Sequence, residues 1–398
     1  MAPHIPFVNT EDDCQRLRKY YPDSFCIRTS LDAIDTIKQR LPENLKLWLD
    51  PSVDGYHHLL ISNSKKPKKV MTPWERLIEK FEENEVMGNA DFLKNPDQGK
   101  LKAFVTSALE LCSKYNPGWI TVPQLPQLND LSRNNINRDL AKKTQEWKLT
   151  SAFNGKLVLP IIFTNQQQYK GKKERNRRKA VIKNCFEISG ANIVWVVDSS
   201  LSDLKGSGTF RNRFSNLIEF HKDLIKWLSN DVTIVAGPYW GINLVLWARE
   251  LCDYPAMSPG SAYMYHIPGP FTLKRGTARV AIPPLRRSVR VDADLRRWLK
   301  DALSKLNPKD SAYQKISNIF SNFNLFLNQD IARDQVARFY KEWLDEIEAV
   351  PAAGRPLALY QAFSSAFVFG KKMPKLSKSE GYGGDASIVA QQLMLNCF

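Results

Sequence analysis

Acidic side chains follow several apolar segments of this chain, at positions suited to acid–base chemistry. Asp50 and Asp54 lie in LDPSVDGYHH, at the end of the apolar segment 45–50. Asp198 ends the apolar segment 192–198, and Asp253 stands in a later, turn-rich segment. Paired carboxylates serve as general acids and bases or hold a divalent cation. We therefore treat these four aspartates as candidate catalytic residues, with loop or turn capping as the structural alternative.

A strongly basic segment follows the apolar segment 157–163. Residues 170–183 hold eight Lys or Arg residues and one glutamate, and amides and a tyrosine precede them. This combination suits contacts with bases and phosphates, although charge runs also form solvated helix faces. The predicted nucleic-acid contacts of this segment are Asn165, Gln166, Gln168, Tyr169, Lys170, Lys172, Lys173, Arg175, Arg177 and Arg178.

The charge of the whole chain favours a polyanionic partner. The formal net charge is +16, and a second basic region at 274–300 adds Arg286, Arg287 and Arg290 to the predicted nucleic-acid contacts. Clustered positive charge favours DNA and RNA alike. Residues that follow other apolar segments are candidates for a pocket, with simple packing as the alternative; they are Gln124, Tyr239, Trp240 and His266.

Apolar segments alternate with helical patterns over more than half of the chain. Such alternation predicts a parallel sheet with helical crossovers. We expect strands at 45–50, 118–123, 157–163, 192–198 and 232–237, with weaker candidates at 262–266 and 278–282. Helices are expected at 30–40, 72–81, 101–112, 136–147, 175–189, 214–228 and 243–251. The predicted fold class is α/β, a (β/α) TIM-barrel-like domain with a mostly helical C-terminal portion.

Three regions follow from this pattern. Residues 1–44 are interpreted as an N-terminal lead-in, 45–285 as the barrel-like domain, and 286–398 as a helical region. Catalytic residues of such barrels follow the carboxyl ends of the strands, so the aspartates and the basic segment are expected on one face.

Several functional classes lack their motifs in this sequence. There is no GxGxxG, GxxxxGK[ST], GxSxG or HExxH pattern, and the six cysteines and five histidines do not have metal-ligand spacing. No apolar stretch is long enough for a membrane span, and the first residues lack a signal pattern. We expect a cytoplasmic protein with reduced cysteines, no membrane partner and no cofactor.

The order and spacing of these features over residues 45–275 resemble the tRNA-guanine transglycosylase superfamily, including its relatives that insert deazaguanine bases into DNA. LDPSVDGYHHL stands where the family has a DSGGF-like loop, and VAGPYWGINLVLWARELCDYPAMSPG is similar to its GVG turn and nucleophile region. The resemblance implies a (β/α)8 barrel, Asp253 as nucleophile, and Asp50 or Asp54 as acid/base. The family's glycine pairs and zinc ligands are missing, and Gln124 replaces an acidic residue.

Three functions remain open from the sequence. The first is a nucleic-acid-binding transglycosylase- or glycosidase-like enzyme that acts on a base in DNA or RNA. The second is a nuclease in which Asp50, Asp54 and Asp198 hold Mg²⁺. The third is a non-catalytic nucleic-acid-binding subunit of a larger assembly, such as a phage-defence (antiviral) or DNA-modification complex.

Overall fold

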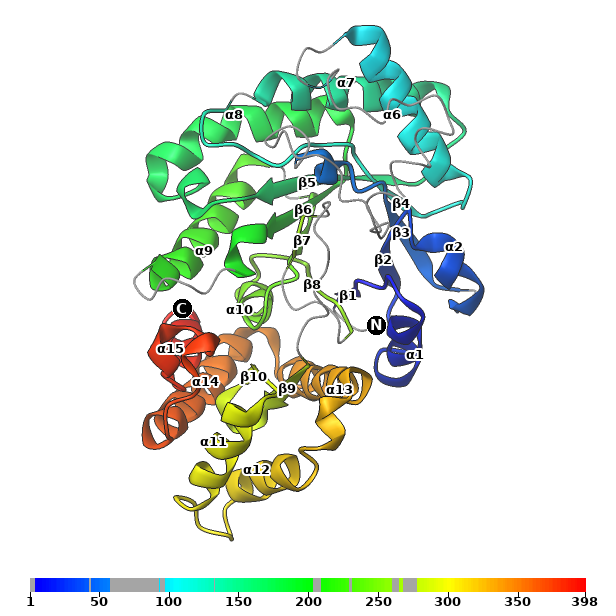
Figure 1. Ribbon diagram of the computed structural model, residues 1–398. Helices are drawn as coiled ribbons and strands as arrows, with labels where there is room; N and C mark the ends of the chain where they lie inside the picture. The colour runs from blue at the N-terminus through cyan, green and yellow to red at the C-terminus, as the bar shows by residue number, and fades with distance from the viewer. Residues whose placement is uncertain are drawn as a thin grey trace, which may run out of the picture.

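A barrel of parallel strands and a following helical region make up the structure, a computed structural model (Figure 1). This architecture confirms the predicted α/β, TIM-barrel-like fold class. The structure describes residues 4–42, 44–57, 93, 97–131, 133–202, 209–228, 231–259, 265–267 and 278–398.

Eight parallel strands form one sheet in the order β1-β8-β7-β6-β5-β4-β3-β2. Phe7, directly after β1, bridges Arg28 of β2, so the two ends of the sheet meet and the sheet curves into a nearly closed barrel. The strands are β1 (Ile5–Pro6), β2 (Cys26–Ser30), β3 (Lys46–Asp50), β4 (Trp119–Thr121), β5 (Lys156–Phe163), β6 (Ile193–Asp198), β7 (Thr233–Ala236) and β8 (Tyr254–Met257).

Helices connect the strands and cover the outside of the barrel, as parallel pairing requires. Local sequence sets where they begin: the side chains of Thr10 and Asp97 accept hydrogen bonds from backbone amides in the first turns of α1 and α6. The helices are α1 (Glu11–Tyr20), α2 (Ile34–Ile37), α6 (Gln98–Ser113), α7 (Asn134–Thr150), α8 (Gly171–Ser189), α9 (Thr209–Trp227) and α10 (Ile242–Ala248).

Aromatic side chains fill the barrel interior. Trp48 contacts Trp119 and Trp195, with ring centroids 6.0 and 5.4 Å apart, and Phe7 packs edge-on against Trp48 and Trp195. Edge-to-face packing of this kind is favourable because a ring edge is positive and a ring face negative. The interior is therefore a packed core, and polar chemistry is left to the ends of the strands.

The region after β8 is mostly helical, as predicted, but it also completes the barrel. A hairpin of β9 (Arg279–Ile282) and β10 (Arg287–Arg290) leads into α11 (Ala293–Leu303), α12 (Ser311–Ser321), α13 (Gln329–Glu348), α14 (Arg355–Lys372) and α15 (Ile388–Met394). Helix α13 packs beside α1, where Tyr21 donates to the Ala337 carbonyl and Lys19 pairs with Asp334. Tyr340 of the same helix bonds Asn243 of α10. Helix α13 thus lies between α1 and α10, where a (β/α)8 barrel has its eighth helix.

The structure differs from the predicted boundaries at both ends of the barrel. The predicted lead-in, 1–44, contains β1 and β2, which belong to the barrel sheet, and β8 occupies a segment predicted to be a loop. These strands are short, and Pro6, Arg28 and Pro255 interrupt any continuous apolar run. The segment 278–282 does form a strand, but in an antiparallel hairpin outside the barrel. The predicted helix 72–81 and most of the segment 262–266 lie outside the described residues.

Candidate active site

Two carboxylates meet at the carboxyl end of the barrel. Asp50 is the last residue of β3, and its two oxygens accept hydrogen bonds from Arg28 and from the Ser52 backbone amide. Ser52 has a left-handed backbone (φ 52°), which turns the chain into the short 3-10 helix Val53–Gly55. This turn brings Asp54 back over the barrel, where it accepts a hydrogen bond from the Tyr265 hydroxyl.

Arg28 is a cation buried inside the barrel. It is only 4% exposed, and its guanidinium lies over the rings of Phe7 and Trp195, 4.7 and 5.1 Å from their centroids. Cation–π contacts and the ion pair with Asp50 together offset part of the cost of removing this charge from water. The arginine therefore fixes Asp50 as a paired carboxylate.

Asp54 has a different electrostatic environment from Asp50. Burial and the nearby charge of Asp50 raise the pKa of Asp54 to about 7, against the opposing effects of the Tyr265 hydrogen bond and Arg28. A carboxyl group with a pKa near neutrality can both give and take a proton at physiological pH. The site thus contains one ion-paired carboxylate and one candidate acid/base.

A small cavity opens beside the carboxylates. Thr121, Gln124, Pro160 and Trp195 line it together with Asp50 and Asp54. Its volume is about 10 Å³, enough for about one water molecule. Gln124 has its amide nitrogen bonded to the Pro123 and Asn137 carbonyls, so its side chain is fixed in the cavity wall.

Replacing Asp54 with asparagine is expected to stabilise the protein at alkaline pH. Because the folded-state pKa is raised to about 7, wild-type stability falls as pH rises from about 4 to about 7 and stays low above that. The variant lacks this loss, so its advantage in unfolding free energy should grow by on the order of 4 kcal/mol as pH rises from about 4 to above 7. Urea unfolding of both proteins at about pH 5 and 8.5 measures it; an advantage independent of pH contradicts the assignment.

No known family model and no curated protein matches this chain. The candidate site therefore rests on its own geometry.

The other two predicted catalytic aspartates lie outside this site. Asp198 is on the outer face of β6, where it accepts hydrogen bonds from the Tyr169 hydroxyl and from Ser200. Asp253 precedes β8, at the amino end of the strand, and accepts a hydrogen bond from the Ile234 amide. It thus lies at the opposite end of the barrel from Asp50 and Asp54. Asp253 does not share a site with Asp50 and Asp54, because residues 254–257 form a strand that begins directly after it. Asp198 ends β6 at the same end of the barrel as Asp50, but its side chain lies on the outer face.

The basic segment divides into buried and exposed parts. Arg175 pairs with Asp223 of α9 and links the two helices. Arg178 donates to Gln127 and to the Gln168 and Leu128 carbonyls, so it ties α8 to the loops after β4 and β5. The exposed cations are Lys170, Lys172, Lys173, Arg177, Lys179 and Lys183. Because α8 follows β5, its first turn and the lysines there lie on the same face of the barrel as Asp50 and Asp54.

The residues that precede the lysines hold the loop together. Gln168 bonds the Thr164 amide and the Gln127 carbonyl, and Asn165 caps the 3-10 helix Gln166–Gln168. Tyr169 is fully buried, with its ring against Phe163 and Phe220. Of the residues predicted here to contact bases, Gln166, Gln168 and Tyr169 are buried and Asn165 is exposed.

The remaining predicted residues are distributed over the helical region and the loops. Tyr239 donates to the Val196 carbonyl of β6, within the barrel. Trp240 packs against Tyr340 and Trp343 and joins the barrel to α13. Arg287 is buried against Glu380, which also accepts from the backbone amide of Arg290. His266 is exposed.

Two residues of the site were not predicted as such, Arg28 and Tyr265. Arg28 lies on the inner face of β2, a strand within the predicted lead-in, so no signal in the sequence marks it as a site residue. Tyr265 lies in the segment predicted to form a pocket wall, but its contact with Asp54 spans 211 residues of sequence.

Among the described residues, no group of three or more His, Cys, Asp or Glu side chains is placed to hold a metal ion. None of the helices in the described part of the chain has the length and apolarity to cross a membrane. All six cysteines are buried and form no disulfide.

Proposed function

We propose that this protein binds nucleic acid on the carboxyl-end face of its barrel and acts there as a glycosidase-like enzyme on a nucleoside. The observation that carries the proposal is the pair Asp50 and Asp54, two neighbouring buried carboxyl groups in different electrostatic environments. Enzymes that cleave glycosidic bonds use such a pair, one protonated and one ionised.

Each carboxyl group has a role that its contacts support. Asp54, with its pKa near 7, protonates the leaving base or accepts a proton from an attacking water. Asp50 has both oxygens engaged by Arg28 and Ser52, so it stabilises positive charge that develops on the sugar instead of acting as nucleophile. The cavity beside them has room for the attacking water.

The exposed lysines at the start of α8 supply the electrostatic part of binding. Lys170, Lys172 and Lys173 lie on the same face as the carboxylates, where they meet the phosphates of a bound strand. Hydrolysis fits better than the base exchange that the transglycosylase resemblance implies, because Asp253, the implied nucleophile, is at the other end of the barrel.

A second candidate function is that of a non-catalytic nucleic-acid-binding subunit of a defence or modification complex. The small cavity favours it, since a base enters only if the surrounding loops rearrange. Release of free base from DNA and RNA oligonucleotides, followed by chromatography, separates the two. Release that Asp54→Asn abolishes supports the enzyme, whereas binding without release supports the subunit.

Charge removal on α8 tests the binding face. The triple variant Lys170→Gln/Lys172→Gln/Lys173→Gln should weaken oligonucleotide binding and lower its salt slope by roughly one to three units, because each lost phosphate contact releases one counterion fewer. The control is Lys300→Gln/Lys305→Gln/Lys309→Gln, which removes the same charge from exposed positions on and after α11. Equal effects of the two triples would show that only net charge matters.

A further inference from the structure

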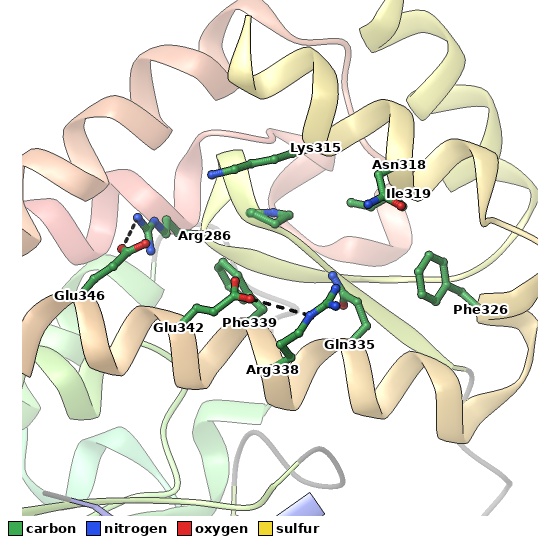
Figure 2. A pocket seen from close by; sticks show the side chains of 11 residues that line it. Arg286, Lys315, Asn318, Ile319, Phe326, Gln335, Arg338, Phe339, Glu342 and Glu346 are labelled. Carbon is green, nitrogen blue, oxygen red and sulfur yellow. Dashed lines mark hydrogen bonds and ion pairs between the residues drawn. The ribbon is translucent and has the colours of Figure 1, made fainter. Parts of the chain in front are cut away.

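A groove crosses the helical region outside the barrel. Its narrower part, a cavity of about 170 Å³, lies between α12 and α13 (Figure 2). Its wider part, about 430 Å³, lies between α12 and α14. Pro283, Arg286 and Lys315 line both cavities, so the two parts meet at these residues.

Arg286 is held rigidly at this junction. Its backbone is left-handed (φ 51°), a conformation that glycine adopts without strain and arginine does not. Its carbonyl accepts a hydrogen bond from Trp240, and its guanidinium lies 5.5 Å from the centroid of the Trp343 ring. These contacts fix the guanidinium at the groove, and a fixed, planar guanidinium is suited to pair with a carboxylate or a phosphate.

The ion pair of Arg286 with Glu346 is weak enough for another anion to replace Glu346. Arg286 pairs with Glu346 at 2.7 Å, but the Glu346 side chain is 53% exposed, and exposed ion pairs are weak. Lys315 projects from the opposite wall, with its ammonium directed toward Arg286 (Figure 2). Among the described residues that line the wider cavity, Arg286 and Lys315 are cations and none is acidic.

We propose that this groove binds a single strand of nucleic acid, whose phosphates contact Arg286 and Lys315 and displace Glu346 from Arg286. The choice of nucleic acid rests on the proposed function and on the net charge of +16. Gln361 and Ser365 of α14, and Asn318 of α12, offer hydrogen bonds to sugars and base edges along the length of the strand.

The test measures binding of short fluorescent single-stranded DNA and RNA by anisotropy over a range of salt. Lys315→Gln and Arg286→Gly should each weaken binding about three- to tenfold and lower the salt slope by about 1. Glycine suits the left-handed backbone, so Arg286→Gly is expected to fold. Arg297→Gln, an exposed arginine of α11 outside the groove, is the matched control and should have little effect.

Glu346→Gln is expected to strengthen oligonucleotide binding, whereas the two groove variants weaken it. If Glu346 competes with phosphate for Arg286, its removal should tighten binding about two- to threefold; a purely structural pair predicts no gain. Unchanged binding in the groove variants, with loss in the α8 triple variant, would overturn this inference and leave the proposed function standing. Absence of salt-dependent oligonucleotide binding by the wild type overturns both. Preferential binding of polyglutamate through Arg286 would replace nucleic acid with an acidic peptide.

Discussion

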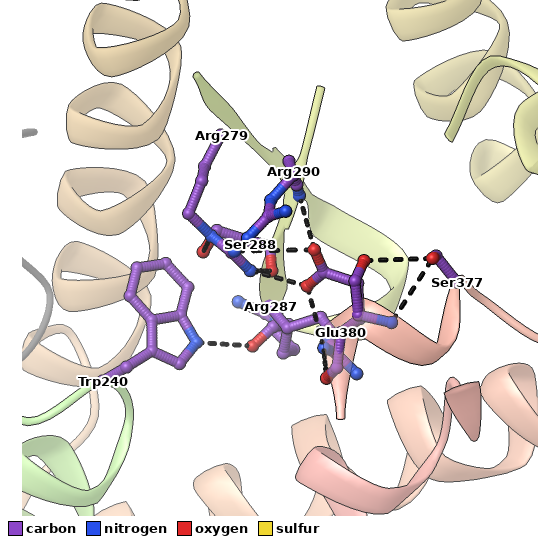
Figure 3. A network of polar contacts seen from close by, with 9 residues as sticks. Trp240, Arg279, Arg287, Ser288, Arg290, Ser377 and Glu380 are labelled. Carbon is purple, nitrogen blue, oxygen red and sulfur yellow. Dashed lines mark hydrogen bonds and ion pairs between the residues drawn. The ribbon is translucent and has the colours of Figure 1, made fainter. Parts of the chain in front are cut away.

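Replacing Glu380 with glutamine is expected to lower the free energy of unfolding by about 3–5 kcal/mol, since it leaves buried arginine without its counter-charge. Glu380 is 2% exposed and accepts hydrogen bonds from the side chains of Arg279 and Arg287 and from the Arg290 amide (Figure 3). It thereby fastens the segment after α14 to the β9–β10 hairpin. Urea unfolding at neutral pH measures the loss.

The control for this variant is an exposed ion pair in the same region. Asp345→Asn removes the partner of Lys341 on α13, where both side chains are partly exposed, and should change stability by less than about 1 kcal/mol. If the two variants lose similar stability, burial of Glu380 does not determine its contribution. An intermediate in the unfolding of Glu380→Gln alone would show that the hairpin and the segment after α14 separate before the barrel unfolds.

The sequence predicts the central strands well and the outer ones poorly, for a physical reason. β5 and β6 are covered on both faces, so they read as continuous apolar runs. β1 has two residues and β2 contains a buried arginine, so neither stands out from a loop. β1 is placed by its pairing with β8, a strand about 250 residues away that was predicted to be a loop. β2 is placed by its pairing with β3, the one recognisable strand beside it.

The residues of the candidate site also divide into those that the sequence predicts and those that it does not. Asp50 and Asp54 could be predicted, because they come directly after a recognisable strand. Arg28 and Tyr265 could not be joined to them, since closure of the barrel and a distant loop bring them there. These two residues, which spacing does not reveal, pair with the aspartates and oppose the rise in the pKa of Asp54 that burial and Asp50 cause.

The basic segment shows what a charge count misses. Helical periodicity places Arg175 and Arg178 on the same face of α8 as the buried residues Ile182 and Cys185. That face packs inward, so those two arginines have structural partners while the lysines beside them stay exposed. Nucleic-acid contacts therefore remain a prediction for the exposed lysines of α8 and not for every cation of the segment.

Replacing Arg28 with methionine is expected to have the second large effect, and one that depends on pH. Methionine approximates the apolar part of the arginine stem, but it leaves Asp50 and Asp54 buried together without a cation. Removing one member of a buried pair costs about 3–5 kcal/mol. Because Arg28 lowers the pKa of Asp54, its loss raises that pKa further, so more of the folded state is protonated at a given pH.

The sign of the pH effect follows from that shift. A carboxyl group whose folded-state pKa is raised loses stability as pH rises toward that pKa, so Arg28→Met should be least stable near pH 8.5 and recover toward pH 5. Adding Asp50→Leu removes the unpaired charge and should restore much of the stability at pH 8.5, as replacement of whole buried ion pairs by apolar residues often does. Urea unfolding of the single and double variants at both pH values decides this. If the single variant loses the same stability at both, packing around Phe7 and Trp195, and not the charge, accounts for the burial of Arg28.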